Sequence, residues 1–289
     1  MRTAADYLHT GEYDKTKFTS AYESLFAHVT KFNKPSIPDL IFVLGKIGSD
    51  KTITDLRWAA YMLATMFVET SHTIKLKRIT PGHPRMQTSS TQKVWRNFVP
   101  VEEAGHGHGL RYFAPVKVER QANGDVNVTE WDGNQWVVSA AGVPRKVQAT
   151  AARGVKPGIA ESPQYQQASG QSNQYYGRGY VQLTWWDNYV SAGMMIGKGL
   201  TFLLDPDRML DPDLAYVVMS KGMVTGRSFA NGRKLSQYFI GGHTDYVGAR
   251  DMVNPGAPLA NKKEVANIAR RFEDALFLSG LDPTIKQDT

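Results

Sequence analysis

Residues 53–69 read Ile53-Thr-Asp-Leu-Arg-Trp-Ala-Ala-Tyr-Met-Leu-Ala-Thr-Met-Phe-Val-Glu69, and this stretch decides the fold class. Its apolar residues recur at the three- and four-residue spacing of an α-helix, and the opposite face is nearly apolar too. A helix that is apolar on all sides is a buried one, so we expect a central helix that ends at about Glu69. Thr52 or Thr54 is the expected cap of its first turn.

Helical spacing recurs on both sides of this segment, at residues 18–31, from Ser36 onward, and at 189–195, 214–224 and 262–277. Between residues 115 and 139, valine and tryptophan instead alternate at the strand period, with Asn-Gly and Asp-Gly pairs as hairpin turn signals. Residues 140–174 are typical of a long connection. The chain is therefore predicted to be mainly α-helical with a small antiparallel β insertion.

The composition is that of a globular protein. The chain has 289 residues, 42% of them apolar and 21% charged, which excludes disorder for its bulk. It has no cysteine, so disulfides and thiolate chemistry are excluded. The formal charge of +7 favours a polyanionic partner, which charge alone leaves open among nucleic acid, an anionic membrane and an acidic cell wall.

Neither a membrane span nor a secretory leader is expected. The longest uncharged apolar run has 11 residues, whereas a spanning helix needs ~17–25. The first residues lack the apolar run of a signal peptide. We therefore expect no stable membrane insertion.

Two segments offer carboxylates for acid–base chemistry. Glu69 ends the apolar helix, where burial would raise the pKa of its carboxyl as a general acid near neutral pH requires; alternatively, it simply ends the helix and points to water. Glu102 and Glu103 precede the glycine-rich turn 105–109, where a second carboxylate could activate water; an ordinary flexible loop is the alternative. His106 and His108 lack a third ligand nearby, so no metal is expected.

The segment Tyr175-Tyr-Gly-Arg-Gly-Tyr-Val-Gln-Leu-Thr-Trp-Trp-Asp-Asn-Tyr189 holds six aromatic residues beside amide and hydroxyl groups. Such a mixture can hold sugar rings by stacking and hydrogen bonding. Stacking of nucleobases is less well supported, because Arg178 is its single cation; an aromatic core turn is the third possibility. Arg250 and Asn254, four residues apart, would face either a cleft or solvent, with solvent as the default.

Taken together, these segments resemble glycoside hydrolase family 19, the chitinase-like branch of the lysozyme superfamily, and within it the phage and prophage endolysins. The resemblance rests on residues 53–70, 100–109, 175–185 and 247–254, and spans about 37–278 apart from 113–172. It implies a single catalytic domain, 1–289, with a two-lobed lysozyme-like fold. The expected parts are an N-terminal lobe (about 1–112), the insertion (about 113–172) and a C-terminal lobe (about 173–289), with the cleft between the Glu69 helix and residues 175–189.

The resemblance implies an inverting mechanism, in which the two carboxyl groups stand roughly 6.5–9.5 Å apart. Glu69 falls on the family's general acid and Glu103 best matches the general base, with Glu102 as the fallback. Thr184 matches the residue that helps to position the attacking water. The expected substrate-binding residues are Tyr176, Gln182, Trp185, Asn188, Arg250 and Asn254. No metal or cofactor is implied.

The sequence departs from the family's pattern at three positions: Val68 stands where a histidine is usual, Ala104 where an aromatic is usual, and Pro255 where a glycine is usual. None of these removes the acid or the base. The expected activity is hydrolysis of β-1,4 bonds in peptidoglycan by a monomer that waits in the host cytoplasm until release to the wall, or is delivered as an effector. The alternatives are chitin as the substrate, a non-catalytic wall-binding module and, least supported, a nucleic-acid binder.

Overall fold

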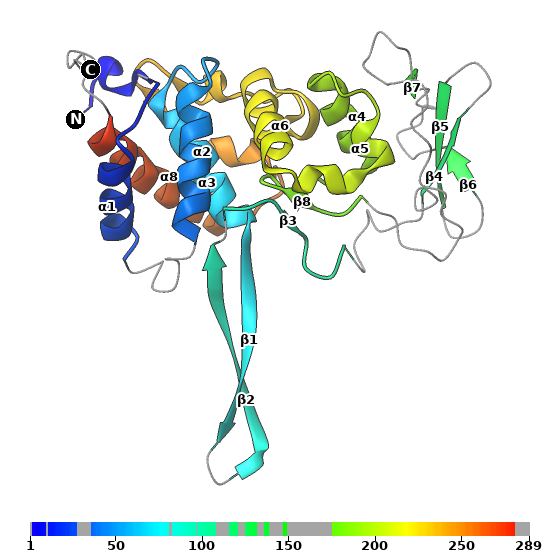
Figure 1. Ribbon diagram of the computed structural model, residues 1–289, viewed down its shortest axis with the longest axis horizontal. Helices are drawn as coiled ribbons and strands as arrows, with labels where there is room; N and C mark the ends of the chain where they lie inside the picture. Colours follow the sequence, from blue (N-terminus) through cyan, green and yellow to red (C-terminus); the bar gives the residue numbers. More distant parts are fainter. Residues whose placement is uncertain are drawn as a thin grey trace. The chain divides into compact units, whose positions relative to one another are not determined.

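The structure, a computed structural model, is mainly helical, as predicted (Figure 1). It describes residues 2–9, 11–27, 36–80, 83–96, 98–107 and 175–280, together with four strands between residues 116 and 148. For 72–96 and for those four strands the description is of the backbone.

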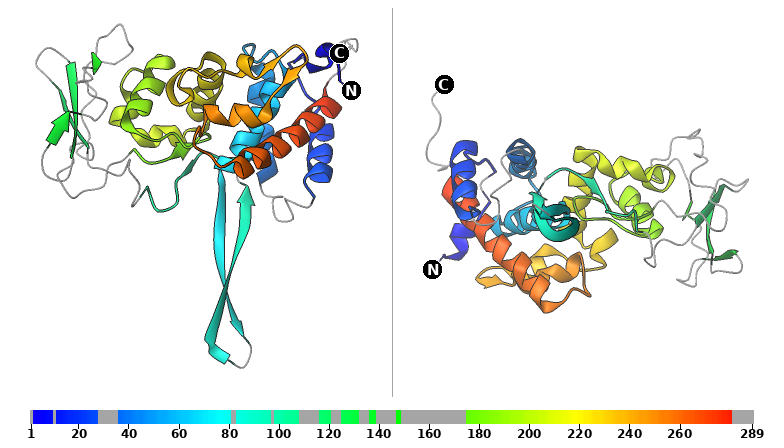
Figure 2. Two further views of the ribbon diagram at one scale, coloured as in Figure 1. Left: turned by 180° about the vertical axis from the view of Figure 1, so that it is seen from behind. Right: turned by 90° about the horizontal axis from the view of Figure 1, so that it is seen from below.

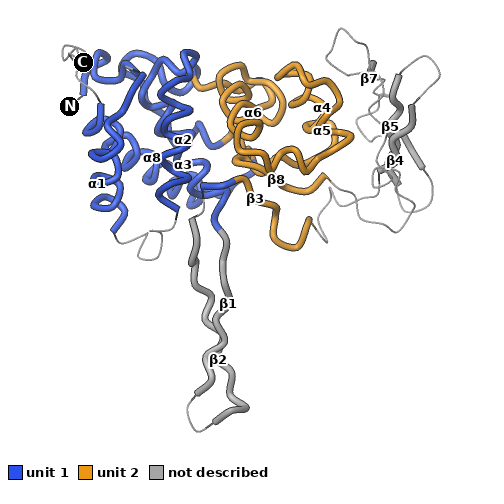
Figure 3. Tube along the Cα trace, in the orientation of Figure 1, with its two compact units in different colours: residues 1–99, 236–250, 256–289 blue, residues 100–235, 251–255 orange. Residues whose placement is uncertain are grey.

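The chain divides into two compact units, neither of which is continuous in sequence (Figure 3). Unit 1 consists of residues 1–99, 236–250 and 256–289, and unit 2 of residues 100–235 and 251–255. The expected lobe boundaries are therefore wrong for the C-terminal part of the chain. Residues 256–289 were assigned to a C-terminal lobe, but the helix they form packs against helices near the N-terminus.

The described residues of unit 1 form five α-helices and two strand pairs: α1 (Lys15–Leu25), α2 (Ile37–Ser49), α3 (Leu56–Glu69), β1 (Ser71–Thr80), β2 (His83–Arg96), β9 (Phe239–Ile240), β10 (His243–Thr244), α7 (Tyr246–Ala249) and α8 (Leu259–Ser279). The helices predicted at 18–31, from Ser36 and at 262–277 correspond to α1, α2 and α8. Residues 28–31 of the first prediction lie outside the described residues.

Helix α3 is the buried central helix that the sequence predicts: every residue from Leu56 to Phe67 except Trp58 is buried. The expected cap, Thr52 or Thr54, is wrong, because Asp55 occupies the N-cap and accepts a hydrogen bond from the Arg57 backbone N–H. The Arg57 side chain adds an ion pair with Asp55 and donates to the His243 carbonyl in β10. One aspartate therefore caps α3 and also holds the buried cation beside it.

An aromatic cluster (Tyr22, Phe26, Phe67, Phe98 and Phe272) fills the core of unit 1. Phe272 of α8 contacts the other four rings, with centroid distances from 4.7 Å to Phe26 up to 6.2 Å to Phe98. All five rings are almost fully buried. They bring α8 against α1 and α3, which can be followed in Figure 2.

The hairpin of β1 and β2 is the main element that the sequence reading did not anticipate. The two strands pair antiparallel in a sheet of their own, with continuous register from Thr73 opposite Lys93 to Ile79 opposite Gln87. Apolar and cationic residues do alternate along β1 (Ile74, Lys75, Leu76, Lys77), but only over four residues, which makes a weak strand signal.

Unit 2 contains three α-helices, a short strand pair and the β insertion: β3 (Val101–Glu102), β4 (Val116–Arg120), β5 (Asp125–Trp131), β6 (Trp136–Val138), β7 (Val147–Gln148), β8 (Arg178–Gly179), α4 (Trp186–Met195), α5 (Thr201–Leu204) and α6 (Pro212–Thr225). The helices predicted at 189–195 and 214–224 are α4 and α6. Asp211 caps α6 through its side chain, and Pro212 is the first helical residue, a position that proline favours.

The small antiparallel insertion is confirmed at the level of the backbone. Strands β4, β5 and β6 pair antiparallel in chain order, and β7 adds a second partner for β5. The two predicted turns, Asn123-Gly124 and Asp132-Gly133, lie outside the described residues.

Along the described part of the chain, no helix combines the length and the apolar character that crossing a bilayer requires.

The aromatic cluster makes a prediction for stability. Phe272→Ala should lower the free energy of unfolding by about 3–5 kcal/mol, because it leaves a cavity among four rings. Leu278→Ala is the matched control, since Leu278 lies on the same helix but is 60% exposed, and it should change stability by no more than about 0.5 kcal/mol. Urea unfolding measures both, and equal effects would contradict the central role of this cluster.

Candidate functional site

Glu69 is the last residue of α3, and its side chain is turned into the protein rather than into water. The carboxyl is 15% exposed, and its Oε1 lies 2.5 Å from Nη1 of Arg250. Both residues belong to unit 1. The alternative in which Glu69 merely ends the helix in solvent is therefore wrong.

Burial raises the pKa of the Glu69 carboxyl, because the surrounding apolar helix disfavours the charged form. The Arg250 guanidinium opposes this rise through its charge and its hydrogen bond, but burial is the larger cause. The carboxyl therefore keeps its proton to a higher pH than an exposed glutamate. Of the two environments that the sequence left open for Glu69, the structure shows the buried one.

Arg250 is positioned by the short helix α7, which ends at Ala249. The Tyr61 hydroxyl of α3 donates a 2.8 Å hydrogen bond to the Ala249 carbonyl, and the Arg250 Nε donates to Oδ1 of Asn261. Arg250 is only 4% exposed, so the default expectation that it faces solvent is wrong. The described partners of the Arg250 side chain are Glu69 and Asn261. Its role in the structure is therefore to pair with Glu69.

Glu103 lies in unit 2, immediately after the short strand β3. Strand β3 pairs with β8, so that Val101 stands opposite Gly179 and Glu102 opposite Arg178. Residues 105–107 then take up left-handed backbone conformations, with φ of 81° at Gly105, 52° at His106 and 70° at Gly107. This turn is closed by a hydrogen bond from the His106 N–H to the Glu103 carbonyl. The glycine-rich segment thus forms a defined turn over its described residues.

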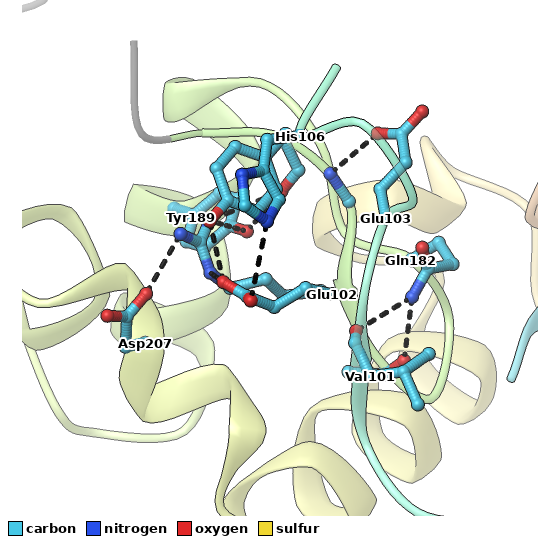
Figure 4. A network of polar contacts seen from close by, with 11 residues as sticks. Val101, Glu102, Glu103, His106, Gln182, Tyr189 and Asp207 are labelled. Atoms are coloured by element: carbon cyan, nitrogen blue, oxygen red, sulfur yellow. Dashed lines mark hydrogen bonds and ion pairs between the residues drawn. The ribbon is translucent and has the colours of Figure 1, made fainter. Parts of the chain in front are cut away.

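The carboxylate of Glu103 is held by the backbone of the aromatic segment. The Gly177 N–H donates to Glu103 Oε2 at 3.0 Å, and the Glu103 N–H donates to the Gly177 carbonyl at 2.8 Å (Figure 4). A Cβ at Gly177 would lie 3.2 Å from that Oε2 and 2.8 Å from Oε1 of Gln182. Gly177 therefore lets Glu103 and Gln182 approach the same point of the backbone.

Gln182 has a different role from the one expected of it. Its side-chain amide donates to the backbone carbonyls of Val101 and Gly179, joining β3 to the β8 turn. Its own backbone is left-handed, with φ of 50°. Through these hydrogen bonds Gln182 stabilises the loop that carries Glu103. The Oε1 atom of Gln182 lies close to Gly177.

Glu102 belongs to a charged network rather than sharing the environment of Glu103. It accepts a 2.6 Å hydrogen bond from the Tyr176 hydroxyl, and its carboxylate lies 3.7 Å from Nε of Arg178 and 3.6 Å from Nε2 of His106. Arg178 is fully buried and forms a 2.8 Å ion pair with Asp207 (Figure 4). The two adjacent glutamates are thus held by different partners.

Tyr176 is enclosed by this network. The His106 ring stacks on it at 4.7 Å, and the Arg178 guanidinium lies 3.8 Å from its centroid. Two planar groups at these distances cannot share one face, so they cover opposite faces. The ring is 7% exposed, and burial followed by the bond to Glu102 raises the pKa of its hydroxyl. Tyr176, which is expected to bind substrate, therefore has both ring faces covered by protein groups.

Thr184, Trp185 and Asn188 lie together at the start of α4. Trp185 is the N-cap residue, with a left-handed φ of 70° and 38% exposure. Asn188 donates its side-chain amide to the Thr184 carbonyl, and both residues are half-buried. Asn254, also in unit 2, is exposed. Trp185 is thus the aromatic residue of this turn that presents surface.

Four residues of the network escaped the sequence reading: Gly177, Tyr189, Arg178 as an ion-pair partner and Asp207. The Tyr189 hydroxyl donates to the Tyr176 carbonyl and accepts from Arg178. A sequence signal did exist for Arg178, since a single arginine among aromatics is a usual partner for acidic groups. Within the described ranges, no group of three or more histidine or acidic residues is arranged to hold a metal ion; His108 lies outside them.

The close approach at Gly177 can be tested by adding one methyl group. Gly177→Ala should lower the free energy of unfolding by about 1–3 kcal/mol, because the new Cβ overpacks against Gln182 and Glu103. Gly242→Ala, whose Cβ would meet no atom within 4 Å, is the control and should unfold like the wild type. Thermal unfolding distinguishes them, and an unchanged Gly177→Ala would contradict the described packing.

The raised pKa of Glu69 predicts a pH-dependent stability. The folded state holds the proton more tightly than the unfolded chain, so this contribution is complete below about pH 4.5 and is lost as the pH rises through the folded pKa. Glu69→Gln cannot ionise. Its free energy of unfolding relative to wild type should therefore increase across that window, measured by urea unfolding at stepped pH. A difference that stays constant or falls would refute the assignment; Glu12→Gln, at an exposed position, controls for loss of one charge.

No protein-family model matches this chain, no curated protein is significantly similar to it, and no solved structure matches its fold.

Proposed function

We propose that this protein is a glycoside hydrolase that cleaves β-1,4 bonds between N-acetylated hexosamines, with peptidoglycan as its substrate. The observation that carries the proposal is the buried carboxyl of Glu69, whose pKa is raised by its apolar surroundings. A glycosidase needs one carboxyl that still holds its proton near neutral pH.

In this mechanism Glu69 donates its proton to the leaving glycosidic oxygen. Arg250 then faces the newly formed carboxylate at ion-pair distance, so the charge that appears on Glu69 has a partner already in place. The same cation limits how far burial can raise the pKa. Arg250 therefore helps to set the pH range in which Glu69 can act as an acid.

Glu103 is the proposed general base, which takes a proton from water as the water attacks the anomeric carbon. The support for choosing it over Glu102 comes from their partners. The Glu103 carboxylate accepts a hydrogen bond from the backbone N–H of Gly177. Glu102 is engaged by Tyr176, Arg178 and His106, an arrangement that holds the strand pair β3–β8. Thr184 remains the proposed helper in positioning the water.

Peptidoglycan is preferred over chitin on the basis of the net positive charge, since a bacterial wall is anionic. Both polymers contain β-1,4 bonds between N-acetylated hexosamines, so the same mechanism would cleave either. A non-catalytic wall-binding module is the second candidate function, favoured by Val68, which stands where the resembled family has a histidine before its acid.

Three substitutions test the roles of the carboxylates. Glu69→Gln and Glu103→Gln should each reduce release of muropeptides from purified peptidoglycan by about 10²–10⁴-fold, the usual contribution of a general acid or base. Glu102→Gln should reduce the release of muropeptides by less than either of these substitutions does. Mass spectrometry of the products measures the loss and identifies the reducing-end sugar. Full activity in Glu69→Gln would refute the mechanism. A larger loss of activity in Glu102→Gln than in Glu103→Gln would show that Glu102, not Glu103, is the general base.

Product stereochemistry gives a separate check of the mechanism. An inverting enzyme acting on β-1,4 bonds should release the α-anomer first, which proton NMR of freshly cleaved chitooligosaccharides detects. Initial release of the β-anomer would rule out an inverting mechanism. Binding of intact wall without any hydrolysis would instead support the wall-binding module.

A further inference from the structure

Most of the net positive charge of the protein comes from one hairpin, because this segment has basic residues without acidic ones. Residues 70–101 contain six basic residues and no acidic residue: Lys75, Lys77, Arg78, Arg85, Lys93 and Arg96. The remaining residues therefore carry a formal charge of only +1, against +7 for the whole chain. Strands β1 and β2 span nearly all of this acid-free segment.

The strand register sorts these residues by face. Lys75 is paired with Thr91, Lys77 with Ser89, and Lys93 with Thr73. Because cross-strand partners share a face and alternate residues share it along a strand, these three lysines stand on one face with hydroxyl residues as their neighbours. Lys75 and Lys77 are roughly 7 Å apart along the strand.

The other face of the hairpin has a different character. It carries Ile74, Leu76 and Arg78 from β1, paired with Gln92, Ser90 and Thr88 of β2. The sheet consists of these two strands alone, so no third strand extends it. Ile79, paired with Gln87, falls on the same face as the three lysines. The two faces thus differ in degree: one, the lysine face, carries three lysines and one isoleucine, the other two large apolar residues and one arginine.

From this arrangement we infer that the β1–β2 hairpin binds the phosphate headgroups of an anionic lipid bilayer. Lysines on one face attract the phosphates, each contributing about a fivefold gain in binding near such a surface. Ile74 and Leu76 stand at the positions that suit the boundary between headgroups and acyl chains. Binding is peripheral, because two apolar residues are too few to insert the hairpin.

A lipid surface fits this hairpin better than a nucleic acid does. The three cations of the lysine face are point charges without the planar fork of arginine, which recognises rigidly held phosphates. Trp95 is the one tryptophan, tyrosine or phenylalanine within β1 and β2, and a single ring is a small platform for successive bases.

The test measures binding of the full-length protein to vesicles. Phosphatidylcholine vesicles with and without 50 mol% phosphatidylglycerol, in about 50 mM salt, are sedimented with wild type and with the triple variant K75Q/K77Q/K93Q. The variant should lose about 100-fold in partitioning onto the anionic vesicles, as three fivefold contributions require. The control K17Q/K51Q/K263Q removes the same charge from exposed positions elsewhere in unit 1 and should lose far less.

Three outcomes would overturn the inference: equal losses in the two triple variants, equal binding of wild type to zwitterionic and anionic vesicles, or preferential binding of duplex DNA when it competes with vesicles. Binding that persists in about 0.5 M salt would also contradict it, because charges at a surface are then screened.

The biological value of this surface rests on the proposed function, since a wall hydrolase works beside membranes, but the two can fail separately. Glu69→Gln should lose hydrolysis and keep vesicle binding. The triple variant K75Q/K77Q/K93Q should lose vesicle binding and keep hydrolysis of soluble chitooligosaccharides. Loss of hydrolysis in that variant would show that the hairpin serves the chemistry and not a lipid surface.

Discussion

The contacts of one phenylalanine ring hold unit 1 together. Phe272 of α8 touches rings from α1, α3 and the segment that follows β2, and these elements come from both ends of the chain. Phe67, two residues before Glu69, is one of those rings. The last turn of α3 is therefore fixed by packing, and the burial of the Glu69 carboxyl follows from that. The raised pKa of this carboxyl is thus a consequence of the packing of an aromatic core.

Unit 2 shows how two adjacent identical residues come to differ. Glu102 lies opposite Arg178 in the β3–β8 ladder, so it enters the ion pairs that surround this buried cation. Glu103 is next in the chain, directly after the strand, and its carboxylate accepts a hydrogen bond from the Gly177 N–H. A one-residue change of register would exchange the two environments. The strand pair is short, but it sets which carboxylate has which partners.

The sequence was most informative where a pattern is local. Helical spacing predicted α3, α6 and α8, and alternation with turn signals predicted β4–β6, because each depends on residues within one element. The cap of α3 was misassigned since three polar residues, Thr52, Thr54 and Asp55, compete for one position. The partners of Glu69 and Glu102 lie 181 and 76 residues away, at Arg250 and Arg178. No periodicity encodes such pairs, and the assignment of residues 256–289 to unit 1 was missed for the same reason.

The discontinuity of unit 1 has a consequence for biosynthesis. Helices α1, α2 and α3 leave the ribosome early, but α8, which supplies Phe272, is made only after the whole of unit 2. Until then the nascent chain exposes the rings that α8 will cover, and Glu69 lacks its ion-pair partner because Arg250 also comes late. Unit 2 can fold while translation continues. The chain therefore assembles its buried acid only near the end of its own synthesis.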